Sequence, residues 1–220
     1  MTIRGRSKAL VLSTLRDVGI IPVIRAESAD VARAVVEALA GAGLAVAEIT
    51  MTVPGALDAI ASVRRHLGEA LVVGAGTVTD ADTARNAIDA GAEFIVTPCL
   101  APEVVDTARR ADVAVIPGAL TPTEVFEAFK AGGDMVKVFP VQNVGGATYL
   151  RALRGPFPAI PLVPTGGITL DNIREMFAAG AVAVGVGGEL ISTDALRRRD
   201  YAAIGALATQ FLAATRRPRA

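Results

Sequence analysis

The chain has 220 residues, of which 52% are hydrophobic and 20% are charged, so it carries enough apolar material for a large core. Its 22 basic and 22 acidic side chains give a formal net charge of zero, which argues against binding nucleic acid or a membrane surface through a basic field. A single cysteine excludes an internal disulfide, and no uninterrupted apolar run is long enough to span a membrane. With no signal-peptide core at the N-terminus, the sequence predicts a soluble cytoplasmic protein.

Short apolar runs rich in β-branched residues recur along the whole chain, which is typical of buried strands. We expect strands in the ranges 20–25, 46–50, 71–76, 93–98, 113–118, 135–140, 161–167 and 181–188. Alanine-rich amphipathic stretches lie between them. These stretches predict helices that begin at the N-caps Ser28, Asp80, Thr121 and Thr169 and end at glycines in 38–43, 87–92, 129–134 and 177–182.

The repeat of strand, helix and glycine turn predicts parallel strands, because each strand is followed by a helix that returns the chain to the same end. Eight such units in a chain of 220 residues favour a single (β/α)8 barrel domain over residues 1–220, with an N-terminal helical segment. The alternative is a doubly wound open sheet with fewer strands. The barrel is favoured because no G-x-G-x-x-G follows the first strand.

Reactive groups in a barrel of this kind lie at the C-terminal ends of the strands, so polar residues late in a strand are informative. The second strand ends in Glu48-Ile-Thr50 and the sixth in Lys137-Val-Phe139. If the side chains of Glu48 and Lys137 both face the barrel interior, they meet across it. Of the three lysines in the chain, only Lys137 stands within a predicted strand.

Lys137 has two interpretations from the residues alone. The first is a structural ion pair with Glu48 that ties two strands together. The second is chemical: desolvation lowers the pKa of a lysine amine in general, and a neutral amine can form a Schiff base with a carbonyl. A buried ion pair rarely stabilises a fold better than apolar packing does, which favours the chemical interpretation.

Two glycine pairs indicate an anion site. Gly166-Gly167 follows the seventh strand and Gly187-Gly188 the eighth, where barrels commonly bind phosphate through backbone amides. A metal site built on histidine or cysteine is not expected, because the chain has one residue of each type, His66 and Cys99. We therefore expect no metal and no cofactor.

The motifs, taken together, resemble the 2-keto-3-deoxy-6-phosphogluconate (KDPG) aldolase family, which includes 4-hydroxy-2-oxoglutarate (KHG) aldolases and phosphogalactonate-specific relatives. The similarity runs from about Gly19 to about Leu190, in order and at matching spacing. The motifs that carry it are EITMTVPGA (48–56), VGAGTV (73–78), IVTP (95–98), VIPGALTPTE (115–124), VKVFP (136–140) and PTGGI (164–168).

The resemblance implies a metal-independent class I aldolase that forms a homotrimer and cleaves KDPG to pyruvate and glyceraldehyde 3-phosphate. It implies cleavage of KHG to pyruvate and glyoxylate as well. Lys137 would be the Schiff-base lysine and Glu48 the general acid and base. Thr77 and Thr165 would contact the substrate carboxylate and neighbouring atoms.

The resemblance also implies how the rest of the substrate is held. Pro98 and Phe139 would shape the pocket around pyruvate, and Arg25 would lie near the catalytic glutamate. The phosphate would bind at the four paired glycines, Gly166, Gly167, Gly187 and Gly188.

Two positions depart from the family pattern. Thr52 stands where many members have an arginine, and Glu189 stands where some have a serine after the second glycine pair. The phosphogalactonate-specific relatives also lack that arginine, so their activity is an alternative. Two further alternatives are a phosphate-binding barrel isomerase or synthase without a Schiff base, and a barrel that only binds a sugar phosphate.

Overall fold

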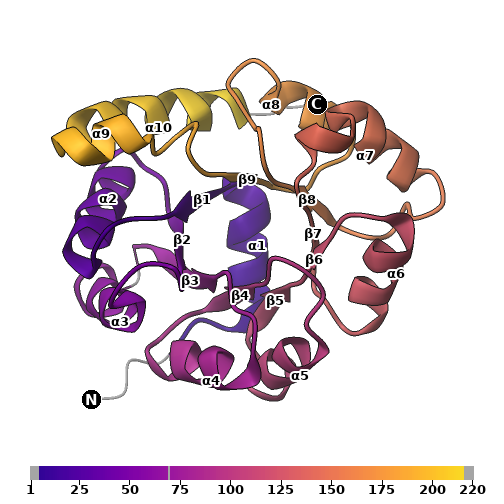
Figure 1. Ribbon diagram of the computed structural model, residues 1–220, viewed down its shortest axis with the longest axis horizontal. Helices are drawn as coiled ribbons and strands as arrows, with labels where there is room; N and C mark the ends of the chain where they lie inside the picture. Colours follow the sequence, from indigo (N-terminus) through magenta and orange to yellow (C-terminus); the bar gives the residue numbers. More distant parts are fainter. Residues whose placement is uncertain (1–4, 69, 216–220) are drawn as a thin grey trace.

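A ring of parallel strands is surrounded by helices in the computed structural model, which describes residues 5–68 and 70–215 (Figure 1). The strands are β1 (Ile20–Ile24), β2 (Val46–Thr50), β3 (Val72–Gly76), β4 (Phe94–Val96), β5 (Ala114–Ile116), β6 (Gly118–Ala119), β7 (Val136–Val138), β8 (Leu162–Pro164) and β9 (Val184–Val186). Only Pro117 separates β5 from β6, and the two share the place of one predicted strand.

The strands form two hydrogen-bonded sheets that join into one barrel. One sheet has the order β5-β4-β3-β2-β1-β9 and the other has the order β6-β7-β8. Pro117 links the two sheets on one side. On the other side, parallel bridges pair Leu162 with Ala181 and Thr165 with Gly185. This closure confirms the predicted (β/α)8 barrel and rules out the doubly wound open sheet.

Helices follow the strands around the outside of the ring (Figure 1). They are α1 (Lys8–Val18), α2 (Ala29–Gly41), α3 (Ala56–Leu67), α4 (Ala81–Asp89), α5 (Pro102–Arg110), α6 (Pro122–Lys130), the 3-10 turn η1 (Gln142–Val144), α7 (Gly146–Arg154), α8 (Ile173–Ala178), α9 (Thr193–Arg198) and α10 (Tyr201–Thr215). Within the described residues, no helix combines the length and apolar character needed to cross a membrane.

Three of the four predicted N-caps are confirmed. The side chains of Ser28, Asp80 and Thr121 each accept a hydrogen bond from a backbone amide three residues ahead, and Thr121 completes a capping box with Glu124. The prediction for Thr169 is wrong, because α8 begins only at Ile173.

Thr169 instead forms a local turn with Asn172. The Thr169 hydroxyl accepts a hydrogen bond from the Asn172 amide at 3.3 Å, and the Asn172 side chain accepts one from the Thr169 amide at 2.9 Å. These reciprocal bonds satisfy the groups that a helical turn would otherwise use, so the helix starts later.

Side chains alternate along each strand between the helices and the barrel interior. Ala47, Ile49, Val136 and Val138 face outward and pack in the layer between strands and helices. A second, smaller apolar group fills the interior, and we call it the inner cluster. It consists of Val11, Leu15, Ile21, Val46, Val72, Phe94, Val96, Ala114, Ile116, Met135, Val163 and Ala183.

Helix α1 closes the N-terminal end of the barrel. It lies across the centre of the ring in Figure 1, and its side chains Val11 and Leu15 belong to the inner cluster. Two ion pairs hold this segment in place: Lys8 contacts Asp134 at 2.9 Å, and Arg6 contacts Glu93 at 2.9 Å.

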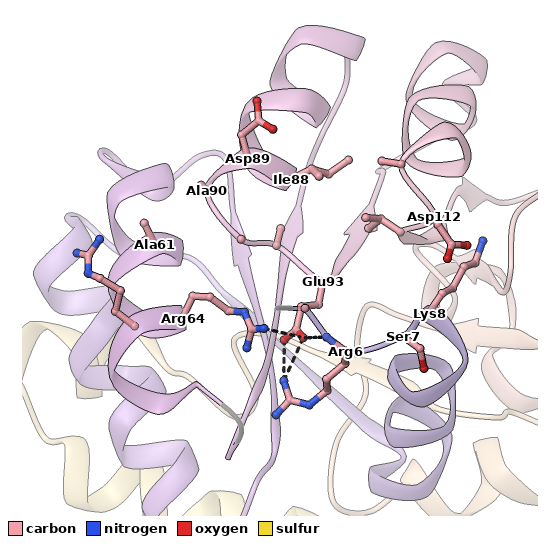
Figure 2. Close-up of a pocket in the computed structure, with 16 residues that line it drawn as sticks. Arg6, Ser7, Lys8, Ala61, Arg64, Ile88, Asp89, Ala90, Glu93 and Asp112 are labelled. Atoms are coloured by element: carbon pink, nitrogen blue, oxygen red, sulfur yellow. Dashed lines mark hydrogen bonds and ion pairs between the residues drawn. The ribbon is translucent and has the colours of Figure 1, made fainter. Parts of the chain in front are cut away.

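A cavity of about 690 Å³ lies beside this N-terminal segment, and the Glu93 carboxylate lies at its floor (Figure 2). Glu93 accepts hydrogen bonds from the Arg6 guanidinium at 2.9 and 3.1 Å and pairs with Arg64 at 3.4 Å. The Glu93 and Arg64 side chains are only 5% and 6% exposed. Arg6 also donates to the carbonyls of Gly68 and Leu71, so the cluster ties the segment before α1 to the base of β3 and β4.

Replacing Glu93 by glutamine is expected to lower the free energy of unfolding by about 3 kcal/mol, because it leaves two arginines without their buried counter-charge. Urea denaturation measures the change. Glu103→Gln, an exposed carboxylate on α5, is the matched control and is expected to change stability by less than about 0.5 kcal/mol. A loss for Glu93→Gln as small as the control's would contradict this account.

Candidate active site

The barrel interior beyond the inner cluster contains two buried charged side chains. Glu48 follows the inward-facing Val46 by two residues on β2, and Lys137 follows the inward-facing Met135 by two residues. Glu48 is 2% exposed and Lys137 is 5% exposed. Strand alternation therefore places both groups inside the barrel, towards the C-terminal ends of the strands.

The Glu48 carboxylate extends over β3. A Cβ built on Gly76 would overlap the Glu48 carboxylate, so a glycine at this position makes the room that the side chain occupies. Atom Oε1 of Glu48 is buried and has no hydrogen-bond partner among the residues that the structure describes. Burial raises the pKa of Glu48, and the charges of Lys137 and Arg25 oppose that rise without cancelling it.

The side chain of Lys137 is held among strands β6, β7 and β8. The Lys137 amide donates to the Pro117 carbonyl at 2.9 Å, and Lys137 pairs in register with Gly118 and Val163. Its Nζ atom lies 5.2 Å from the centroid of the Phe139 ring. The amine is therefore packed against an aromatic face inside the barrel.

Glu48 and Lys137 do not form the structural ion pair that was one interpretation of Lys137. No ion pair within 4.0 Å joins their side chains in the part of the chain that the structure describes. Their charges still interact. The positive charge of Lys137 lowers the pKa of Glu48, and its effect is larger than that of Arg25. Both groups thus lie inside the barrel and influence each other electrostatically without a direct ion pair.

Two more of the predicted residues stand at the ends of β3 and β4. Thr77 has a φ of 57°, in the left-handed region that β-branched residues rarely adopt. Backbone strain of this kind is found preferentially at functional sites. Pro98 follows β4, and its backbone lies so close to Gly118 that a Cβ there would overlap it.

A second set of predicted residues lines a pocket of about 160 Å³ at the ends of β1, β8 and β9, which we call the distal pocket. Its lining residues are Val23, Arg25, Phe139, Thr165, Gly166, Gly167, Ile168, Gly187, Gly188 and Glu189. The structure therefore brings together Arg25, Phe139, Thr165 and both glycine pairs. Thr77 and Pro98 are not among the residues that line this pocket.

The two glycine pairs serve different purposes. Gly166 and Gly167 have φ values of 94° and 74°, so the turn itself requires glycine there. Gly188 lacks a positive φ, and a Cβ on it would meet nothing within 4 Å. Neither the backbone nor the packing thus explains Gly188, and what its glycine allows is the close approach of a ligand.

The amides of the distal pocket are available to such a ligand. Within residues 5–68 and 70–215, the N–H groups of Gly167 and Gly188 have no protein acceptor within hydrogen-bond distance. Backbone donors that converge without internal partners are a common way to bind an anion.

Two positioning residues escaped the sequence analysis. Gly76 gives space to Glu48, and Gly185 gives space to Thr165, whose hydroxyl a Cβ on Gly185 would overlap. The available signal was alternation: Gly74 and Gly76 both occupy inward-facing positions of β3, where a barrel normally places larger side chains.

Gly76→Ala is expected to lower kcat at least about tenfold, because an added methyl group displaces the Glu48 carboxylate. Steady-state kinetics measure the loss, and circular dichroism checks that the fold is kept. Gly41→Ala, on α2 with nothing within 4 Å of the new methyl group, is the control and should leave kcat unchanged. Full activity in Gly76→Ala would show that Glu48 does not need this space.

Sequence comparison agrees with this geometry. The profile of the family described as "KDPG and KHG aldolase" matches residues 11–207. The chain belongs to this aldolase family. The aldolase is 34% identical over 202 residues to the 2-dehydro-3-deoxy-phosphogluconate aldolase of Treponema pallidum, and the match covers 92% of this chain and 96% of that one.

Solved structures of aldolases share the fold. The 2-keto-3-deoxy-6-phosphogluconate aldolase of Zymomonas mobilis with 3-phosphoglycerate superposes with a TM-score of 0.85 at 32% identity, over 96% of this chain and 98% of that one. The KDPG aldolase of Legionella pneumophila, with pyruvate as a covalent carbinolamine, gives a TM-score of 0.84 at 28% identity, over 90% and 96% of the two chains. The aldolase described here is thus a class I lyase with a TIM-barrel fold.

Proposed function

We propose that this aldolase cleaves 2-keto-3-deoxy-6-phosphogluconate to pyruvate and glyceraldehyde 3-phosphate, and also cleaves 4-hydroxy-2-oxoglutarate to pyruvate and glyoxylate. The observation that carries the proposal is the pair of buried groups inside the barrel, Lys137 and Glu48, whose charges interact without an ion pair within 4.0 Å in the described residues. A lone lysine beside a buried carboxyl group is what Schiff-base chemistry on a ketone needs. The carbinolamine in the Legionella relative supports the same chemistry here.

In the proposed reaction, the neutral amine of Lys137 adds to the C2 ketone of the substrate and gives a carbinolamine. Protonated Glu48 donates its proton to the leaving hydroxyl group, so water departs and a protonated imine remains. Burial raises the pKa of Glu48, which favours the protonated form of the carboxyl group that this step uses.

The same carboxyl group, now ionised, then acts as a general base. As a carboxylate, Glu48 accepts the proton of the C4 hydroxyl group, the C3–C4 bond breaks, and its electron pair flows into the imine. The aldehyde leaves, and an enamine stays bound to Lys137. Glu48 returns the proton to C3, and water hydrolyses the resulting imine to pyruvate and free lysine.

The family resemblance suggests how the remainder of the substrate binds, and the distal pocket supports the part that concerns the phosphate. Thr77 and Thr165 contact the carboxylate of the pyruvate part, and Phe139 with Pro98 forms its apolar walls. The phosphate binds in the distal pocket at the amides of Gly166, Gly167 and Gly188, with Gly187 giving space and Arg25 supplying positive charge. The Zymomonas relative, which holds 3-phosphoglycerate, supports a phosphorylated ligand.

The assembly proposed is a homotrimer of single-domain chains spanning residues 1–220, of which 1–4, 69 and 216–220 lie outside the described residues. Exposed aromatic surface supports an interface between copies. Phe126 is 46% exposed and Phe129 is 39% exposed on α6. Phe126 also stacks on Phe157, with ring centroids 5.9 Å apart. Light scattering on the purified protein is expected to give three times the chain mass, and a monomer would contradict the assignment.

Borohydride reduction in the presence of pyruvate tests the chemistry, and a substrate panel tests the specificity. We expect a stable pyruvyl adduct on Lys137, located by peptide mass spectrometry. We also expect pyruvate release from both the phosphorylated and the short unphosphorylated 2-keto-4-hydroxy acid. A folded wild-type protein that forms no adduct would favour a phosphate-binding isomerase or synthase. Faster cleavage of the C4 epimer would indicate the phosphogalactonate activity.

A further inference from the structure

The distal pocket contains a carboxylate that the proposed function leaves unexplained. Glu189 follows the second glycine pair and lines the same pocket as Gly166, Gly167 and Gly188. The amides of Gly167 and Gly188 have no protein acceptor in the described residues and so attract an anion, whereas a carboxylate repels one. A phosphate in this pocket is therefore attracted by the backbone amides and repelled by the Glu189 carboxylate.

The charges of the pocket lining nearly cancel. Arg25 and Glu189 are the only charged residues among those that line it. Both side chains are exposed, and neither forms an ion pair within 4.0 Å in the described part of the chain. The Glu189 carboxylate is thus not neutralised by direct contact, and its charge stays available to act on whatever occupies the pocket.

The backbone around Glu189 fixes where this charge lies. The carbonyl of Gly187 accepts hydrogen bonds from the amides of Leu190 and Ile191, both at 2.9 Å, which closes a turn with Glu189 inside it. Leu190 and Ile191 are 1% and 5% exposed, so their packing anchors the turn. Helix α9 begins only at Thr193, which leaves Glu189 on the loop at the rim of the pocket rather than within a helix.

We propose that Glu189 is a specificity-determining residue that lowers the preference of the aldolase for a phosphorylated tail and so admits an uncharged, hydroxylated one. The carboxylate repels the phosphate dianion and accepts hydrogen bonds from hydroxyl groups. This inference rests on the proposed function, because it assumes that the tail of a 2-keto-4-hydroxy acid occupies the distal pocket. To that function the inference adds a substrate class, namely 2-keto-4-hydroxy acids without a phosphate group, which compete with phosphorylated ones for the same site.

Glu189→Gln tests the proposal, because the amide keeps the size of the side chain and removes only its charge. The comparison substrate is 2-keto-3-deoxygluconate, which has the same chain as KDPG with a hydroxyl group in place of the phosphate. The ratio of kcat/KM for KDPG to kcat/KM for 2-keto-3-deoxygluconate is expected to rise about three- to tenfold, the scale of one partly screened charge. The change should appear in KM for KDPG rather than in kcat, since the repulsion acts equally on bound substrate and transition state. Glu189→Ser should shift the ratio in the same direction.

Inorganic phosphate gives a second readout that does not depend on turnover of a phosphorylated substrate. It should inhibit pyruvate release from 2-keto-3-deoxygluconate more strongly in Glu189→Gln than in wild type, at constant ionic strength maintained with chloride. Glu27→Gln is the matched control, because Glu27 is an exposed carboxylate two residues after Arg25 and outside the pocket lining. It should leave both the ratio and the inhibition unchanged.

The outcomes separate this inference from the proposed function. If wild type cleaves both substrates and the ratio in Glu189→Gln stays constant or falls, the proposal for Glu189 is wrong and the aldolase function stands. The same holds if Glu27→Gln shifts the ratio as much as Glu189→Gln does. If wild type releases no pyruvate from either substrate and forms no adduct with pyruvate, the proposed function fails, and the role of Glu189 falls with it.

Discussion

Lys137→Met is expected to abolish pyruvate release and adduct formation while the barrel stays folded. The expected loss in kcat/KM is on the order of 10⁴–10⁶-fold, the scale on which removing a catalytic nucleophile acts. Methionine retains most of the length of the side chain and places an apolar group among buried neighbours, so the free energy of unfolding should not fall. A coupled assay for pyruvate and borohydride trapping with mass spectrometry measure the two losses.

The control for this variant is Lys130→Met, at an exposed lysine in the last turn of α6. It should keep wild-type kinetics and wild-type adduct formation. Lys137→Arg keeps a positive charge in the barrel and removes the nucleophile, so it should be as inactive as Lys137→Met. Substantial turnover in Lys137→Arg would mean that the lysine acts through its charge, as in an isomerase, and would contradict the Schiff base.

Glu48→Gln is expected to lower kcat by about 10²–10⁴-fold, the usual contribution of general acid–base catalysis, because the amide neither gives nor takes a proton in the cycle. The trapped pyruvyl adduct on Lys137 should still form, although more slowly, since the nucleophile remains. Single-turnover kinetics separate the two effects. A Glu48→Gln enzyme with wild-type turnover would remove Glu48 from the mechanism.

The same variant has a consequence for stability that depends on pH. Burial raises the pKa of Glu48 in the folded protein, so the folded state binds this proton more tightly than the unfolded state does. The contribution of this group to stability is therefore present at low pH and is lost as the pH rises from 4.5 through the raised pKa. Glutamine does not titrate, so Glu48→Gln should gain stability relative to wild type at pH 8 and lose that advantage near pH 4.

Urea denaturation at the two pH values measures this difference, with Glu37→Gln, an exposed glutamate on α2, as the control. The control should show the same offset from wild type at both pH values. If Glu48→Gln does so as well, the buried carboxyl group does not carry the proton assigned to it.

The barrel and the inward direction of its two key side chains were predictable because both follow from short-range periodicity. Strands alternating with helices predict a parallel sheet, and a period of two residues places Glu48 with Val46 and Lys137 with Met135. The distal pocket was also predicted in outline, because the ends of neighbouring parallel strands meet at one edge of the barrel.

Features that depend on contacts between distant segments were not predictable in the same way. The interruption at Pro117 arises because proline has no N–H for the ladder, although its carbonyl still accepts from Lys137. The separation of Glu48 from Lys137 depends on the barrel radius and on the space above Gly76, which no local pattern encodes. The late start of α8 depends on the turn between Thr169 and Asn172, which competes with a helix using the same residue types.

The position of helix α1 also bears on the order in which the two products leave the barrel. Because Val11 and Leu15 pack into the inner cluster at the N-terminal end of the barrel, the C-terminal end is the entrance to Lys137 in the proposed reaction. In the proposed reaction the aldehyde is nearer that entrance, while the three-carbon fragment stays tethered to Lys137 behind it. Product release should therefore be ordered, with the aldehyde first and pyruvate last. In the reverse direction pyruvate must enter before the aldehyde, so that an aldehyde arriving early blocks its own partner.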